Sequence, residues 1–172
     1  MATVGYTFAG ETTDGIDNFI EVGRFNSSAG AGDADTIHCA ASKASGNLTA
    51  MAGVYSSVTD APQDLLSSAV SLTVDSDDFT PVFESGAITW NGIADSTDYF
   101  IGMNGQSGMT SYFDTGTGIA DMHFAARTHS NDLPDPYPSD TPIAREYSFY
   151  VTYTLSGGGG GIEILRRRIE GC

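Results

Sequence analysis

Hydrophobic and polar residues alternate with a period of two along most of the chain. The clearest run covers 147–155, and shorter runs cover 37–41, 48–54, 70–74, 99–103 and 122–126. Such alternation places one face of each strand on a core and the other face in solvent. Turn-forming sequences rich in Gly, Ser, Asn and Asp separate the runs. About eight to ten short strands at this spacing predict an all-β protein, an antiparallel β-sandwich or jelly roll.

Two stretches depart from the alternation. A short stretch near Leu65 and Leu66 is the one candidate for helical structure. Residues 133–142 contain four prolines, which hold the backbone extended and exclude a central strand. We expect a stiff surface connection into the last strand, which serves either as a plain loop or as a presented binding loop.

The character of the chain changes after Ser156, where five consecutive glycines are followed by an apolar and basic peptide. The sequence thus divides into a β-sandwich domain (1–156), a glycine linker (157–161) and a C-terminal docking peptide (162–172). A glycine run behaves as a flexible tether, and eleven residues are too few for a stable isolated helix. The peptide is therefore either disordered or docked on another surface. In the second case its partner-binding residues are Ile162, Ile164, Leu165, Arg166, Arg167, Arg168 and Ile169.

Length and charge narrow the classes of partner. The 172 residues fit one domain with an appendage, and the formal net charge is −15. The body, 1–161, holds four basic and 20 acidic residues and so carries −16. Such a body repels nucleic acid and anionic membrane surfaces, so neither is expected as a partner. The acidic bias is typical of a salt-tolerant extracellular surface, or it serves solubility alone.

No motif predicts an enzyme or a cofactor. The chain lacks a nucleotide-binding glycine loop, a nucleophile elbow and a His-Glu-x-x-His motif. His38 and His123 fall in predicted strands, where structural roles are expected, and His129 near Asp132 is the one candidate acid–base pair. The acidic turns 33–35 and 75–78 offer oxygen ligands for Ca²⁺ but lack the spacing of a calcium loop, so no metal site is assigned.

The two cysteines are not expected to pair. Cys39 falls within an apolar alternation and is predicted to be buried, whereas Cys172 lies in the tail and is predicted to be an exposed thiol.

Aromatic residues are the remaining candidates for binding, because an exposed ring can stack on a sugar. Trp90 follows an apolar run and is predicted to lie in the core. Tyr112 and Tyr137 are flanked by Gly, Ser, Pro and Asp, so they are expected to be exposed as possible glycan-binding residues.

Three stretches of the body carry a family resemblance: 13–25, 52–68 with 88–102, and 133–153. They resemble, in this order, the opening strand, the central strands, and the closing loop and strand of small β-sandwich domains found in uncharacterised tailed-phage virion proteins. The sequence departs from the pattern at 95–97, where a glycine turn is expected, and at Phe100, where a tryptophan is expected. The resemblance covers nearly the whole body and omits the tail, and its motifs are structural.

The resemblance implies a non-enzymatic virion structural protein on the exterior surface of a tailed phage or virus, of the capsid decoration (cement) or head-fibre type. The expected partner is the major capsid protein or another virion protein, and a homo-oligomer is expected. The glycine run and the apolar residues after it, which lie outside the resemblance, predict that the C-terminal peptide makes the attachment. The alternative is a carbohydrate-binding or receptor-binding adhesin of a tail fibre, which would use Tyr112 and Tyr137.

Overall fold

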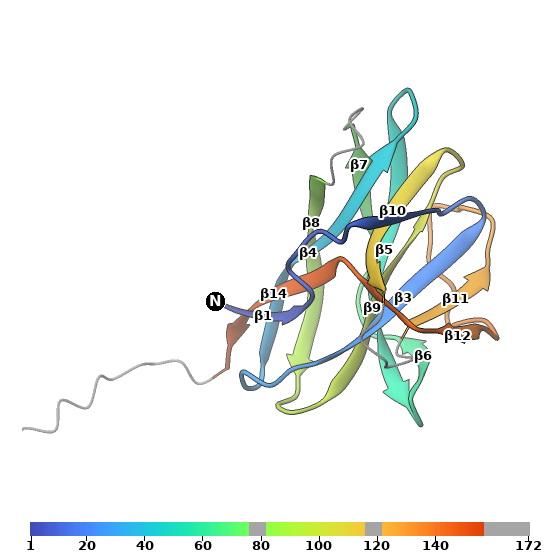
Figure 1. Cartoon of the computed structure of the whole chain (residues 1–172). Coiled ribbons are helices and arrows are strands. Elements are labelled where there is room, and N and C mark those ends of the chain that lie inside the picture. The colour runs from blue at the N-terminus through green and yellow to red at the C-terminus, as the bar shows by residue number, and fades with distance from the viewer. Residues whose placement is uncertain (76–81, 116–121, 157–172) are drawn as a thin grey trace, which may run out of the picture.

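Two antiparallel β-sheets packed face to face form the body of the protein. The computed structural model describes residues 1–75, 82–115 and 122–156, and all regular structure in these ranges is β-strand. Figure 1 shows the strands of both layers, with β1 and β14 side by side. The predicted antiparallel β-sandwich is confirmed. The linker 157–161 and the docking peptide 162–172 lie outside the described residues.

The first sheet, which we call the β4 sheet, has the strand order β1-β14-β4-β10-β13, with β2 also pairing β10 and β8 pairing β4. Its strands are β1 (Ala2–Gly5), β2 (Thr12–Gly15), β4 (Gly32–Lys43), β8 (Val82–Ile93), β10 (Met109–Thr115), β13 (Arg145–Tyr147) and β14 (Phe149–Leu155).

The second sheet, the β9 sheet, has the order β12-β11-β3-β9-β5-β6, with β7 also pairing β5. Its strands are β3 (Phe19–Asn26), β5 (Leu48–Val58), β6 (Ala61–Leu65), β7 (Val70–Val74), β9 (Asp98–Gly105), β11 (Met122–Ala126) and β12 (Thr141–Ile143).

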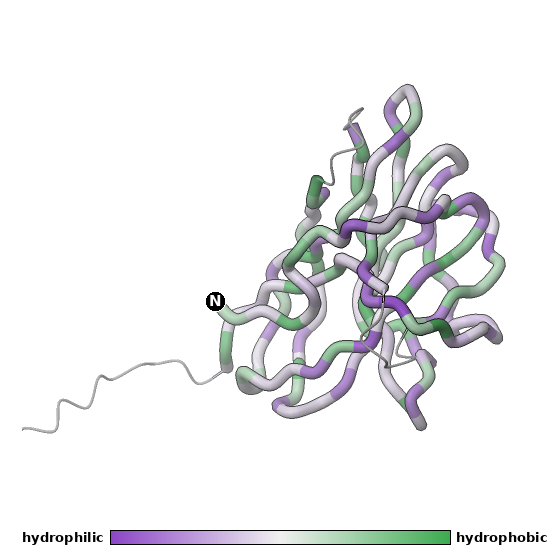
Figure 2. Tube along the Cα trace, viewed as in Figure 1, coloured by the Kyte–Doolittle hydropathy of each residue, from purple (hydrophilic) through white to green (hydrophobic). Residues whose placement is uncertain are grey.

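The strands follow the alternation in the sequence, with two corrections. The described residues hold fourteen strands, so the expected eight to ten is too low, partly because the run 147–155 is divided at Ser148 into β13 and β14. The helical candidate near Leu65 and Leu66 is wrong, because Leu65 ends β6, which pairs with β5. Figure 2 shows hydrophobic and hydrophilic positions interleaved along the strands.

The main core lies between the sheets. It includes Ile37, Cys39, Ile101, Phe149 and Val151, all fully buried. Removal of this apolar surface from water is the main favourable contribution to folding. The predictions that Trp90 and Cys39 are buried are confirmed; Trp90 packs edge-on against Tyr99 with ring centroids 4.7 Å apart. Cys39 is a free thiol, and burial raises its pKa. Cys172 lies outside the described residues.

A second, smaller core lies on the outer face of the β9 sheet, beneath a segment that we call the covering segment (127–140). Leu133 and Tyr137 from this segment pack with Ile20, Tyr55 and Phe100. The Tyr55 hydroxyl donates to the Pro134 carbonyl at 3.0 Å. The proline-rich stretch then ends in β12, which lies at the edge of the sheet, as expected of a strand that contains proline. This stretch is therefore a packed cover for the sheet.

Candidate functional site: a polar pocket at one end of the sandwich

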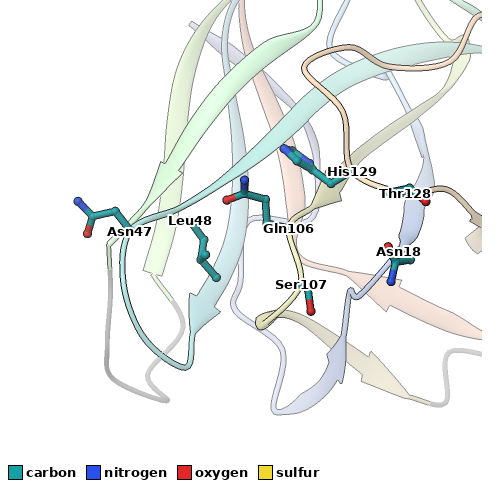
Figure 3. Close-up of a pocket in the computed structure, with 7 residues that line it drawn as sticks. All are labelled: Asn18, Asn47, Leu48, Gln106, Ser107, Thr128 and His129. Atoms are coloured by element: carbon teal, nitrogen blue, oxygen red, sulfur yellow. The ribbon is translucent and has the colours of Figure 1, made fainter.

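Four chain connections meet at one end of the sandwich and form an open pocket of about 610 Å³. They are the β2–β3, β4–β5 and β9–β10 connections and the start of the covering segment. The polar lining consists of Asn18, Asn47, Gln106, Ser107, Thr128 and His129. Figure 3 shows Gln106 and Ser107 in the middle, with Leu48 on one side and Thr128 and Asn18 on the other. The volume falls within the range of about 300–1,000 Å³ that is usual for small-molecule sites.

Hydrogen bonds to the strands hold two of the lining side chains in place. Gln106 Oε1 accepts from the Thr49 amide at 2.8 Å, so the amide nitrogen Nε2 remains as its donor. His129 Nδ1 lies 3.1 Å from the carbonyl of Asn104, and it must donate because a carbonyl only accepts. His129 Nε2 then accepts from the Thr49 hydroxyl at 3.5 Å. The ring is thus fixed by bonds at both nitrogens.

The connections around the pocket are also tied to each other. The fully buried Asn104 donates from Nδ2 to the carbonyls of Phe19 (2.9 Å) and Arg127 (3.0 Å). The Arg127 amide donates to the Asn18 carbonyl at 2.7 Å. The Asp17 carboxylate accepts from the Gly108 amide at 2.6 Å and joins the β2–β3 turn to the β9–β10 turn. A pocket formed in this way is organised before a ligand arrives, which reduces the entropic cost of binding.

The lining holds no carboxylate, lysine or arginine among the described residues, although the body carries −16. Three carboxamides and two hydroxyls provide both hydrogen-bond donors and acceptors, and Leu48 provides an apolar surface. The Asn47 carboxamide is also held from outside the lining, because its Oδ1 accepts from Lys43 Nζ at 3.4 Å. No carboxylate lines the pocket among the described residues.

A second polar cluster lies at the sheet interface and surrounds Glu21 of β3. Glu21 is 3% exposed, and burial raises its pKa to about 7. The hydroxyls of Ser111 and Tyr147 and the positive charge of Arg145 lower this pKa, but their effect is smaller than that of burial. Within the described part of the chain, Glu21 Oε2 and the Ser111 hydroxyl have no hydrogen-bond partner of normal geometry. The cluster reaches the surface through Arg145, whose Nη1 lies 2.5 Å from Asp14 Oδ2. Its chemistry therefore bears on the pH dependence of stability, which we take up in the Discussion.

The expectation that Tyr112 and Tyr137 are exposed is wrong. Tyr112 is 2% exposed, because β10 lies between β4, β2 and β13, and its hydroxyl donates to Ser42 Oγ at 2.9 Å. Tyr137 is 7% exposed and packs edge-on against Tyr55, and its hydroxyl donates to the Ile20 carbonyl at 3.3 Å. Neither ring presents a face on which a sugar could stack.

The burial of Tyr137 gives a measurable prediction. Tyr137→Ala should lower the free energy of unfolding by about 3 kcal/mol, because it leaves a cavity beneath the covering segment. Tyr137→Phe should cost less than about 1 kcal/mol, because it loses a single long hydrogen bond. Urea unfolding of the three proteins measures both values. Equal stability of Tyr137→Ala and the wild type would contradict the packing of this ring.

His129 and Asp132, the candidate acid–base pair, do not bond to each other. His129 bonds to Asn104 and Thr49, whereas the Asp132 carboxylate accepts from the amide of Leu133. His123, in β11, has Asp140 Oδ2 2.5 Å from its Nδ1 and fixes the end of the covering segment. His38, in β4, stacks on Tyr150 with centroids 4.2 Å apart, and burial lowers its pKa. The expected strand positions of His38 and His123 are confirmed.

The acidic turns considered as calcium ligands are only partly described. Asp33 Oδ1 accepts from the Gly92 amide at 3.2 Å, and Asp35 Oδ2 accepts from the Thr154 hydroxyl at 2.9 Å. Residues 76–78 of the other turn lie outside the described residues. Across 1–75, 82–115 and 122–156, no group of three or more potential metal-ligating side chains is assembled.

The structure does not describe the partner-binding residues expected at 162–169, which follow the last described residue, Ser156. Of the pocket residues, the sequence singles out His129 alone, as a candidate acid–base residue and not as part of a pocket. The stretches 44–47 and 104–108 belong to the turn-forming sequences that separate the predicted strands, and only the sheet topology shows that they lie at the same end of the molecule.

The described residues hold no helix long and apolar enough to cross a membrane.

Comparisons with known proteins do not assign a family to this chain. Neither the protein-family models nor the curated proteins give a match to this chain.

Proposed function

We propose that this chain is a structural protein displayed on the exterior of a tailed phage or virus particle, of the decoration or head-fibre type. The sandwich is the displayed part. The peptide 162–172 attaches it to a capsid or other virion protein, and the glycines 157–161 act as the tether.

The observation that carries the proposal is the position at which the chain leaves the sandwich. Ser156 donates its amide to the Ala31 carbonyl at 2.8 Å, directly beyond the pairing of Leu155 with Gly32 at the start of β4. The pocket lies beyond the other end of β4, where Lys43 pairs with Met109. Twelve residues of strand separate these ends by roughly 35 Å. A domain tethered after Ser156 would therefore present its pocket end away from the attachment point.

Charge and composition also support this arrangement. The peptide 162–172 carries three arginines and two glutamates, or +1, against −16 for the rest of the chain. Its isoleucines and leucine need apolar contact, and its arginines can pair with acidic groups on a partner. The acidic body keeps displayed copies soluble and apart.

Deletion of 157–172 tests the attachment. We expect the truncated chain to fold as the full chain does but to be lost from purified particles, with at least a tenfold drop in copies per particle. The copy number is measured by quantitative mass spectrometry of gradient-purified particles of the phage or virus that encodes the chain. Circular dichroism checks the fold.

A matched pair of full-length variants separates the peptide from its tether. Ile162→Ser/Leu165→Ser/Ile169→Ser should reproduce the loss, whereas replacing the five glycines with a Gly-Ser linker of equal length should leave incorporation unchanged. Undiminished incorporation of the truncated chain would overturn the attachment proposal.

A further inference from the structure

We propose that the pocket at the free end of the sandwich is a binding site for a neutral carbohydrate. The inference goes beyond the display function and does not depend on it, because the pocket is made by the sandwich alone. It assigns glycan binding to the pocket residues instead of Tyr112 and Tyr137, which are buried.

The first argument is the chemistry of the lining. Sugar hydroxyls both donate and accept hydrogen bonds, and the carboxamides of Asn18, Asn47 and Gln106 do the same. The hydroxyls of Ser107 and Thr128 form no hydrogen bond within the described part of the chain, so they can bond to a ligand at no internal cost. Leu48 offers an apolar surface to the C–H face of a sugar ring.

The second argument is charge. An anionic ligand would approach a body of −16, which repels it at long range. A cationic ligand would be expected to meet a carboxylate, yet the lining holds none, and the nearby Asp17 carboxylate accepts from the Gly108 amide. A neutral ligand rich in hydroxyl groups avoids both difficulties.

The third argument is the fixed geometry of the walls. Gln106 and His129 are both held by Thr49 of β5, and the buried Asn104 ties two of the connections to the β9 sheet. The lining holds no arginine or lysine, the long side chains that change conformation most readily. Specific polar recognition needs donors and acceptors that are positioned in advance.

The test uses the full chain on an array of neutral, sialylated and sulfated glycans. We expect binding to one or more neutral glycans and none that requires a sialic acid or sulfate. The neutral glycan that gives the strongest signal is then titrated calorimetrically against the wild type and the variants below.

Ser107→Ala/Thr128→Ala removes two pocket hydroxyls that hold nothing else in place, and we expect about a tenfold weaker affinity. Ser107→Trp fills the pocket and should abolish binding. The control Ser28→Ala/Thr89→Ala removes two exposed hydroxyls near the tether end and should bind as the wild type does. Thermal unfolding confirms that each variant is folded.

Failure to bind any neutral glycan on the array would overturn the proposal, as would recognition of acidic glycans alone. Binding that the pocket variants and the control leave equally unchanged would also overturn it. None of these results affects incorporation into particles, so this inference and the display function fail independently.

Discussion

Replacing Glu21 with glutamine should stabilise the protein by about 3 kcal/mol at pH 8.5 and change little at pH 4.5. Glu21 is buried between the sheets, and its pKa is raised from the ordinary 4.5 to about 7. The groups that face it are Asp14, Arg145, Tyr147 and, through its charge, Tyr137.

The direction in which stability changes with pH depends on whether the folded or the unfolded state holds the proton of Glu21. Between pH 4.5 and 7 the folded protein keeps a proton on Glu21 that the unfolded chain has released. The stabilisation from a raised pKa is complete below the unfolded value and is lost as the pH rises through the folded value. Wild-type stability should therefore fall across this window, whereas glutamine stays neutral and removes the fall.

Urea unfolding at intervals from pH 4.5 to 8.5 measures the effect as the difference between the two proteins. Groups remote from Glu21 contribute equally to both proteins. Burial raises the pKa values of Tyr137 and Tyr147, which also feel the charge of Glu21, so these tyrosines do not titrate in this pH range and the difference reports on Glu21. Glu11→Gln, at an exposed position, is the matched control and should retain the wild-type profile. If Glu21→Gln loses as much stability as the wild type between pH 4.5 and 8.5, the Glu21 carboxyl is not the cause of the pH dependence.

Gly102→Ala should destabilise the protein by more than about 4 kcal/mol or prevent folding. Gly102 lies in β9, between β3 and β5 at the centre of its sheet. A Cβ there would lie 2.0 Å from the Glu21 carbonyl oxygen and 2.7 Å from Val22 Cα. Both are backbone atoms of a paired strand, so the contact is relieved only by separating β3 from β9.

Gly15→Ala is the matched control, because a Cβ at this position in β2 meets nothing within 4 Å. It should change stability by less than about 0.5 kcal/mol. Soluble yield and urea midpoints measure both variants. A Gly102→Ala protein that unfolds at the wild-type midpoint would contradict the close approach of the two strands.

The alternation of residues predicted the fold well because each strand contributes one face to a shared core. Ile37, Cys39 and Ala41 in β4, for example, are all buried on the inner side. Alternation does not reveal a second covered face, however. The β9 sheet is covered on its outside by 127–140, so Tyr137 is buried in a segment whose composition indicates a surface loop.

The candidate site could not be predicted from the sequence for a topological reason. Asn18 and Thr128 are 110 positions apart in the chain, and they meet because β3 pairs with β11. Similarly, Asn47 and Gln106 meet because β5 pairs with β9. Polar residues in turns have no periodic pattern, so their convergence depends on strand pairing that a single sequence does not specify.

The pairing of β14 bears on how the domain would respond to mechanical load. A pull applied after Ser156 acts along β14, which is bonded to β1 on one side and to β4 on the other. Interstrand hydrogen bonds lie perpendicular to antiparallel strands, so this force shears two ladders at once instead of unzipping one bond at a time. If the opposite end holds a ligand, the tension runs from Ser156 toward the pocket, along the direction of β4, whose two ends mark these two positions.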